Sequence, residues 1–214
     1  MMPAESAMAM IVLLPSLIIT SPCPRFQAPD RTRPLTTGHI LRPSLLPISR
    51  LRKRFSFPAR SFSAIPLLAE YFVKKGIRKA FALSPDKGAL HIARQAQQIL
   101  GGDCGHLDKQ RDRYSGQTSQ TGKGLDVKGK TVVIFDDIIS TGGTIVGAAK
   151  ILRELGATHV FTACVHPLLI GDAEKRILDA GVEEIVGTDS VPSGVSKVSL
   201  APLISEELKA FASG

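Results

Sequence analysis

The most informative stretch of this chain is Thr131–Thr144, which reads Thr-Val-Val-Ile-Phe-Asp-Asp-Ile-Ile-Ser-Thr-Gly-Gly-Thr. Its first five residues are β-branched or aromatic, a pattern typical of a strand buried on both faces. Asp136 and Asp137 are expected where this strand ends. A turn rich in hydroxyl groups and glycine follows, and Ile145–Leu155 has helical spacing until Gly156. The stretch therefore predicts a strand, a polar loop and a helix, in that order.

The loop between this strand and this helix has the chemistry of an anion site. The N–H groups of a first helical turn have no intrahelical partner, and the helix dipole adds partial positive charge there. Gly142 and Gly143 allow the backbone to approach a phosphate closely. Ser140, Thr141 and Thr144 offer hydroxyl donors to its oxygens. We therefore expect this loop to bind a phosphate group.

The two carboxylates beside the loop indicate a second ligand group. Asp136 and Asp137 would repel a phosphate, but they suit the hydroxyls of an attached sugar, either directly or through a divalent metal. The alternative is an ordinary turn capped by Ser140 or Thr141. Acidic residues at the carboxyl end of a buried strand favour the ligand site, because open α/β sheets bind ligands at that edge. No Gly-Lys-Thr or Gly-Lys-Ser follows the loop, which excludes a Walker A loop here, and the Gly-x-Gly-x-x-Gly pattern of dinucleotide sites is also missing from it.

Charge and cysteine content limit the function classes. The formal net charge of +8 is that of many nucleic-acid-binding proteins, but residues 1–54 carry +6 of it and residues 55–214 only +2. No nucleic-acid partner is therefore expected. Cys23, Cys104 and Cys164 are widely spaced and form no Cys-x-x-Cys pair. This pattern fits a reduced cytoplasmic protein with neither a zinc site nor a disulfide framework.

Residues 1–54 differ from the rest of the chain. They hold eight of the 14 prolines, with scattered arginines and serines and only two acidic residues. Ala7–Ile19 is apolar, but Pro15 interrupts it and it is too short to span a bilayer. Only Glu5 is charged before it, unlike a secretory signal. We expect an unmatched, disordered basic leader that includes the cluster Arg50–Arg54, with an organellar transit peptide as the alternative.

From residue 55 to residue 214 helical and strand patterns alternate, which predicts one α/β domain with a mainly parallel sheet covered on both faces. The expected helices are Ala64–Lys75, Leu90–Leu100, Ile145–Leu155, Asp172–Ala180 and Ile204–Ala210. Besides the strand from Thr131, the expected strands are Lys79–Leu83, Cys104–Leu107, Thr158–Val165, Glu184–Thr188 and Lys197–Leu200. Asp108–Lys128 is polar without an apolar period, and we expect a long functional or mobile loop.

Two further segments carry candidate chemistry. Ser84–Ala89 reads Ser-Pro-Asp-Lys-Gly-Ala at a strand end, which predicts a second oxyanion or metal-bound phosphate with Asp86 as a metal ligand, or else a plain β-turn. Lys109 and Arg111 are two residues apart, so an extended chain puts both on one side. Such a pair could neutralise a transferring phosphoryl group, or be a solvated charge cluster. His166 follows a strand and either faces the pocket or is structural.

Taken together, three motifs resemble one enzyme family. They are Ser-Pro-Asp-x-Gly, then Asp-Lys-x-Arg, then Asp-Asp-Ile-Ile-Ser-Thr-Gly-Gly-Thr, in this order and spacing. They are similar to the ribose-phosphate diphosphokinases, or phosphoribosyl pyrophosphate (PRPP) synthetases, of the archaeal type. The likeness continues through the segments 163–166, 188–192 and 200–203, and covers roughly residues 55–211.

This resemblance implies a type I phosphoribosyltransferase-like fold and a set of site roles. Lys109 would be the catalytic cation, assisted by Arg111. Asp86, as a magnesium ligand, would lie with Lys87 and Gly88 beside the phosphates of ATP, the second substrate. The ribose 5-phosphate site would comprise Asp136 and Asp137 at the ribose and Ser140, Thr141, Gly142, Gly143 and Thr144 at the 5-phosphate.

Two departures from the family pattern qualify this expectation. Ser140 stands where many members carry an acid. More seriously, the family consists of two similar halves, and only the second is matched. Residues 1–54 contain neither the Phe-x-Asp-Gly-Glu loop nor the Arg-Gln-Asp motif of the half that grips adenine and supplies a metal-ligating histidine.

The expected function is therefore that of a truncated ribose-phosphate diphosphokinase in nucleotide biosynthesis, which converts ATP and ribose 5-phosphate to PRPP and AMP. We expect turnover at least roughly a thousandfold below that of a complete enzyme. A phosphoribosyltransferase that uses PRPP and a base, or a non-catalytic half that binds phosphosugar, are the alternatives. A cytoplasmic homo-oligomer with no membrane partner is expected.

Overall fold

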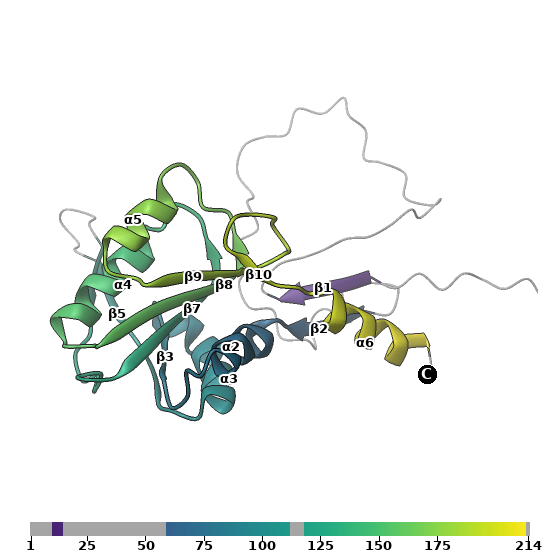
Figure 1. Cartoon of the computed structure of the whole chain (residues 1–214), viewed down its shortest axis with the longest axis horizontal. Coiled ribbons are helices and arrows are strands. Elements are labelled where there is room, and N and C mark those ends of the chain that lie inside the picture. The colour runs from purple at the N-terminus through teal and green to yellow at the C-terminus, as the bar shows by residue number, and fades with distance from the viewer. Residues whose placement is uncertain (1–9, 15–58, 112–117, 213–214) are drawn as a thin grey trace, which may run out of the picture. The chain divides into compact units, whose positions relative to one another are not determined.

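The computed structural model describes residues 10–14, 59–111 and 118–212 of the chain (Figure 1). The chain divides into two compact units, Met1–Ser63 and Ala64–Gly214. In the first unit, β1 (Met10–Leu14) pairs in parallel with β2 (Ala59–Ser63). The sequence analysis predicted neither strand. The rest of residues 1–54, including the cluster Arg50–Arg54, lies outside the described residues, so the leader stays a prediction.

The second unit is built on a six-stranded parallel sheet, which confirms the predicted α/β class. Its strands are β3 (Phe81–Ser84), β4 (Cys104–His106), β7 (Thr131–Ile139), β8 (His159–Pro167), β9 (Glu184–Thr188) and β10 (Ser196–Val198). The helical elements are α2 (Ile65–Lys74), the 3₁₀ turn η1 (Lys87–Ala89), α3 (Leu90–Leu100), α4 (Gly143–Glu154), α5 (Ala173–Asp179) and α6 (Ala201–Ala212).

Alternating side chains of the central strand β7 reach opposite faces of the sheet. On one face, where α2 and α3 pack together, the ring of Phe135 meets that of Phe72 edge-on, with centroids 6.3 Å apart. On the other face Ile134 belongs to an apolar cluster with Ile145 of α4 and Ile177 of α5. Helices thus cover both faces, as predicted and as Figure 1 shows.

The strand order β10-β9-β8-β7-β3-β4 contains a reversal beside β7. From β3 the chain first moves outward to β4, and then returns to the other side of β3 to form β7, β8, β9 and β10. In open parallel sheets, ligands bind outside the carboxyl ends of the strands at such a reversal. The ends of β3 and β7 therefore define the edge where a ligand is expected.

Two predicted boundaries near this edge were wrong. The central strand does not end at the carboxylates: β7 continues to Ile139, and Asp136 is in register with Cys164 of β8. Asp108–Lys128 is not a continuous loop, because β5 (Asp108–Arg111) and β6 (Thr118–Thr121) form an antiparallel hairpin within it. The hairpin strands contain no alternating apolar residues, so the apolar period that reveals a half-buried strand is missing.

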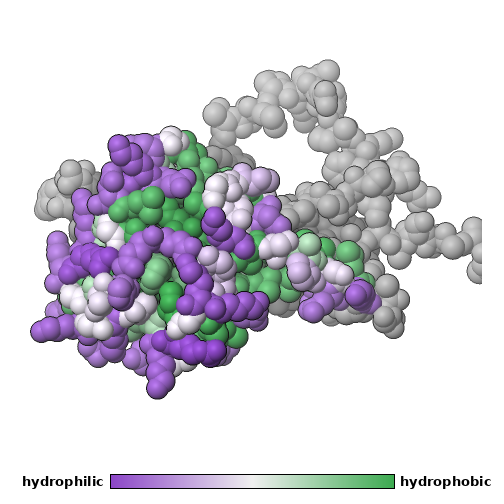
Figure 2. All heavy atoms as spheres, in the orientation of Figure 1, coloured by the Kyte–Doolittle hydropathy of each residue, from purple (hydrophilic) through white to green (hydrophobic). Residues whose placement is uncertain are grey.

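Polar side chains cover much of the visible face in Figure 2, with apolar residues between them. Three of the large apolar residues that are exposed lie on the turn after β8 and on α5, namely Leu168, Ile170 and Leu178. Among the described residues, no helix is long and apolar enough to span a membrane.

Candidate functional site

The turn from β7 into α4 is shaped by Gly142. This residue is the helix N-cap, with φ 76° and ψ −3° in the left-handed region that glycine tolerates best. A Cβ atom here would also lie 2.9 Å from Cδ1 of Ile177, so the backbone runs too close to α5 for a side chain. A Cβ on Gly143 would meet nothing within 4 Å. Gly142 is therefore fixed by packing and conformation, whereas Gly143 faces open space.

No side chain caps the start of α4. The side-chain cap by Ser140 or Thr141 that the alternative interpretation assumes is therefore not formed, and the phosphate site stays a prediction. The carbonyl of Ser140 accepts a hydrogen bond of 3.0 Å from the N–H of Ile170, which ties the loop to the turn after β8. Thr141 is exposed, and Ser140 and Thr144 are half-buried. The uncapped N–H groups and three hydroxyls remain a coherent anion-binding set.

Asp136 and Asp137 form a linked pair within the second half of β7. The N–H of Asp137 donates to Oδ1 of Asp136 over 2.9 Å, and the N–H of Ile138 donates to Oδ1 of Asp137 over 2.8 Å. Burial, followed by the negative charge of Asp137, raises the pKa of Asp136 to about 8. The charge of Asp86 adds to this rise. Ionising both carboxyls of the pair therefore costs free energy, and hydrogen bonds from sugar hydroxyls or a bound cation would lower that cost.

The turn after β3 is closed by its own side chains. Oδ1 of Asp86, the N-cap of η1, accepts a hydrogen bond of 3.1 Å from the N–H of Ala89. The hydroxyl of buried Ser84 donates to the carbonyl of Asp86 over 2.6 Å. Lys87 and Gly88 are exposed. This capped turn holds the Asp86 carboxyl in place beside the β7 site.

These residues fit a magnesium ion that a substrate helps to hold. The described residues contain no group of three or more His, Cys, Asp or Glu side chains placed for a metal. Mg²⁺ usually needs only one or two carboxylates, with water and phosphate oxygens as its other ligands. Asp86 follows β3 and Asp136 lies on the neighbouring strand β7, and the charge of Asp86 contributes to the raised pKa of Asp136. Asp86 therefore remains the candidate ligand.

Lys109 and Arg111 lie on β5, opposite Gln120 and Thr118 of β6. The sequence analysis did not single out Gln120. Its Nε2 donates to the carbonyl of Pro85 over 3.0 Å, which joins the hairpin to the Asp86 turn. A lone glutamine in a polar stretch gives no sequence signal for such a contact.

His166 lies at the end of β8, in register with Ile138 of β7, and is only 7 % exposed. Its Nδ1 lies 2.9 Å from Oγ of Ser190, and no hydrogen-bond partner is found for its Nε2. Burial lowers the pKa of His166, opposed by the charge of Asp137. In its neighbour Cys164, burial and then the charge of Asp136 raise the thiol pKa to about 12, so this thiol is not a nucleophile.

Gly124–Thr131 matches the Walker A spacing Gly-x₄-Gly-Lys-Thr, which the sequence analysis overlooked. The match does not form a phosphate loop, since it precedes strand β7 instead of opening a helix. Nζ of Lys130 pairs with Asp103 at 3.2 Å and with Asp126 at 3.0 Å.

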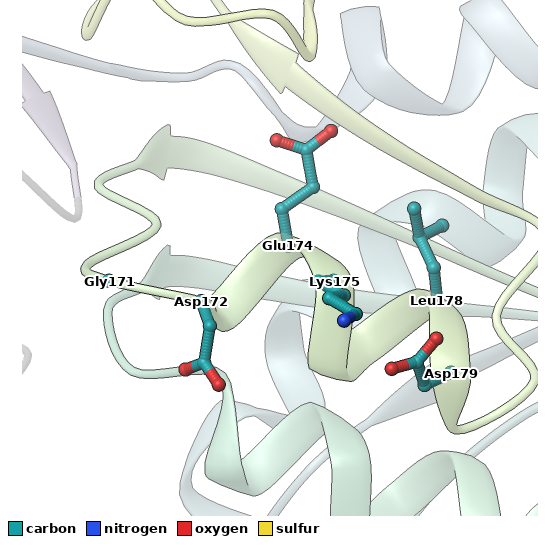
Figure 3. Close-up of a pocket in the computed structure, with 6 residues that line it drawn as sticks. All are labelled: Gly171, Asp172, Glu174, Lys175, Leu178 and Asp179. Atoms are coloured by element: carbon teal, nitrogen blue, oxygen red, sulfur yellow. The ribbon is translucent and has the colours of Figure 1, made fainter.

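A surface pocket lies on α5 and the turn before it. It is lined by Gly171, Asp172, Glu174, Lys175, Leu178 and Asp179. Figure 3 shows Glu174 pointing away from Asp172, so the carboxylates of these two residues do not converge. None of the predicted site residues lines this pocket.

Comparisons with known proteins identify the family of the chain. The phosphoribosyl transferase domain model matches residues 59–201. A ribose-phosphate pyrophosphokinase from Methanothermobacter thermautotrophicus is 45% identical over 160 residues, which cover 74% of this chain and 55% of that protein. The one from Pyrococcus furiosus is 43% identical over 150 residues, with 69% and 53% covered.

A solved structure supports the same relationship. The phosphoribosylpyrophosphate synthetase from Mycobacterium smegmatis has a TM-score of 0.64 and 31% identity, and the match covers 77% of this chain and 56% of that one. The chain thus spans about half the length of the relatives it matches. The resemblance inferred from the three motifs is confirmed, and the chain belongs to the phosphoribosyl transferase domain family.

Proposed function

We propose that this chain carries the ribose 5-phosphate half of a ribose-phosphate diphosphokinase. The observation that carries the proposal is the pairing of an uncapped helix start with the Asp136–Asp137 carboxyls on one sheet edge. The 5-phosphate accepts hydrogen bonds from the Ser140–Thr144 loop. The carboxyls accept hydrogen bonds from the ribose hydroxyls, because a carboxylate is an acceptor.

In the proposed reaction the C1 hydroxyl oxygen of ribose 5-phosphate attacks the β-phosphorus of ATP. The bond from this phosphorus to the α,β-bridging oxygen breaks, AMP leaves, and the hydroxyl proton is released. Such transfers depend mainly on positioning and on charge neutralisation. Lys109 and Arg111 supply positive charge from the hairpin. When bound, Mg²⁺ would neutralise phosphate charge beside Asp86.

Two other functions stay as alternatives. A phosphoribosyltransferase would consume PRPP and a base, and the Asp-Lys-x-Arg motif favours the synthetase over it. A non-catalytic half would bind phosphosugar without chemistry. The match to about half of each relative is the observation that keeps this second alternative. Binding contacts remote from the reacting atoms lower the free energy of the transition state. Residues 1–214 alone should therefore turn over at least roughly a thousandfold more slowly than a full-length relative.

One experiment separates the three functions. The purified chain is incubated with ATP, ribose 5-phosphate and Mg²⁺, and separately with PRPP and each common base, beside the full-length relative from Methanothermobacter thermautotrophicus. We expect slow AMP formation that Lys109→Ala abolishes. Formation of a nucleotide from PRPP and a base would instead support a phosphoribosyltransferase. Binding of ribose 5-phosphate without either product would identify a non-catalytic half. AMP formation as fast as that of the relative would contradict the expected impairment.

A further inference from the structure

Gln120 joins the β5–β6 hairpin to the turn after β3 and to helix α4. Its Nε2 donates to the carbonyl of Pro85, in the Ser-Pro-Asp turn, over 3.0 Å. Its backbone is the register partner of Lys109 across the hairpin. Its Oε1 is seated against Gly147 of α4, the helix that starts at the phosphate loop, where a Cβ would lie only 2.6 Å away.

Glycines make this close contact possible. Gly147 lies in the interior of α4, where glycine is less favourable than alanine by about 0.5–1 kcal/mol. Gly122, just after β6, has the same relation to α4: a Cβ there would lie 2.6 Å from Cδ1 of Leu155. The end of the hairpin therefore runs directly along α4, with Gln120 reaching from it to the Pro85 carbonyl.

We propose that Gln120 is a positioning residue, which fixes the strand bearing Lys109 over the Pro85–Asp86 turn. The inference rests on the proposed function, because it assigns the hairpin to the pyrophosphate end of the substrate. We call the contact between Gln120 and the Pro85 carbonyl the Gln120 latch. With this latch in place, position 109 has a defined place relative to Asp86 before substrate binds. Without it, the hairpin must be ordered at the expense of binding free energy.

Three variants test the latch. Gln120→Ala removes the donor. Gln120→Glu replaces the donor with a carboxylate that would face the Pro85 carbonyl, so it should be at least as harmful. Gly147→Ala introduces a methyl group where the Gln120 amide sits and displaces it, although alanine favours the helix. Gln98→Ala is the matched control, since Gln98 is exposed on α3.

Two readouts are combined. Calorimetry compares the affinities for ribose 5-phosphate and PRPP, which differ by the pyrophosphate group that Lys109 and Arg111 would meet. We expect Gln120→Ala and Gly147→Ala to weaken PRPP binding about threefold to tenfold, the range of one neutral hydrogen bond, with ribose 5-phosphate affinity changed less than about twofold. Backbone hydrogen exchange of β5 and β6 should be faster in both variants. Gln98→Ala should change neither readout.

Gly147→Ala distinguishes the effect of losing the Gln120 latch from the effect of a general loss of stability. This variant should melt at the same temperature as the wild-type chain or higher, and still lose part of the PRPP preference. Unchanged hydrogen exchange in both variants, or an equal fall in the two affinities, would overturn the proposal. Failure of the proposed function would show itself separately, as a wild-type chain that does not bind ribose 5-phosphate.

Discussion

The two turns that leave the β3–β7 edge differ in how they use their polar groups. After β3, the Asp86 carboxyl accepts a hydrogen bond from the N–H of Ala89 at 3.1 Å, and the Ser84 hydroxyl donates to the carbonyl of Asp86. After β7, Gly142 begins the helix without any side-chain cap. Strands β3 and β7 are parallel neighbours, so both turns lie at one edge.

Because of this difference, we expect the two turns to bind different groups. In the capped turn the Asp86 carboxyl accepts the N–H of Ala89, and this hydrogen bond holds the carboxyl at a fixed place. An uncapped turn leaves its donors for a ligand. The phosphate is therefore expected at the turn after β7, and the cation at the turn after β3. Substitutions that distort the uncapped turn after β7 or remove the cap of the turn after β3 test whether the two turns bind different groups.

The largest effect is expected from Gly142→Ala. Alanine there would have a strained positive φ and a Cβ 2.9 Å from Cδ1 of Ile177, so either the loop or the Ile177 side chain must shift. We expect a loss of about 1–3 kcal/mol in the free energy of unfolding and at least a tenfold loss in ribose 5-phosphate affinity. Urea unfolding and calorimetry measure the two effects.

Gly143→Ala is the matched control, because a Cβ at Gly143 meets nothing within 4 Å and its φ is not positive. The free energy of unfolding should stay within about 1 kcal/mol of the wild-type value. If Gly142→Ala bound ribose 5-phosphate as tightly as the wild-type chain, the open turn would not be the phosphate site.

Asp136→Asn should stabilise the protein and impair the site. The pKa of Asp136 is about 8 in the folded protein and lies near 3.8 in the unfolded chain. A raised folded pKa means that stability is full below pH 4 and is lost as the pH rises towards 8. Asparagine removes this loss while keeping an acceptor for the N–H of Asp137.

Thermal unfolding from pH 4 to pH 9 without ligand measures the effect. The variant should exceed the wild-type chain by at least about 1.4 kcal/mol near pH 8, the equivalent of one pKa unit, and by little near pH 4. Its affinity for ribose 5-phosphate should fall. An equal stability difference at both pH values would show that Asp136 does not titrate as described.

The smallest effect is expected from Asp86→Ala, which opens the closed turn. Loss of the cap should cost about 1 kcal/mol of stability. Ribose 5-phosphate affinity without metal should change less than about twofold, since the phosphates assigned to this turn are those of ATP. Asp86→Asn keeps a capping oxygen and should retain most of the stability. A loss of affinity in Asp86→Asn as large as that in Asp137→Asn would show that the turns share one task.

The sequence predicted the parts of this edge that have an apolar signal. The first half of β7, helix α4 and the glycine loop follow from residues 131–156, because burial on both faces and helical spacing leave clear patterns. The extension of β7 through Asp137 to Ile139 could not be predicted, since aspartate is depleted in strands.

The hairpin and the Gln120 latch were missed for a related reason. Strands β5 and β6 are polar, and their pairing depends on backbone register and on contacts with Pro85 and α4. Both contacts join segments distant in sequence, so no local pattern records them. The three motifs nevertheless indicated the family, because each motif is a local sequence.

The most direct test is calorimetry of ribose 5-phosphate with Mg²⁺ on the wild-type chain, Asp137→Asn and Gly143→Val. The central claim is that the open turn and the carboxyls of β7 together form the phosphosugar site. It predicts saturable binding by the wild-type chain and at least a tenfold loss, about 1.4 kcal/mol, in each variant. Unchanged affinity in both variants would contradict it.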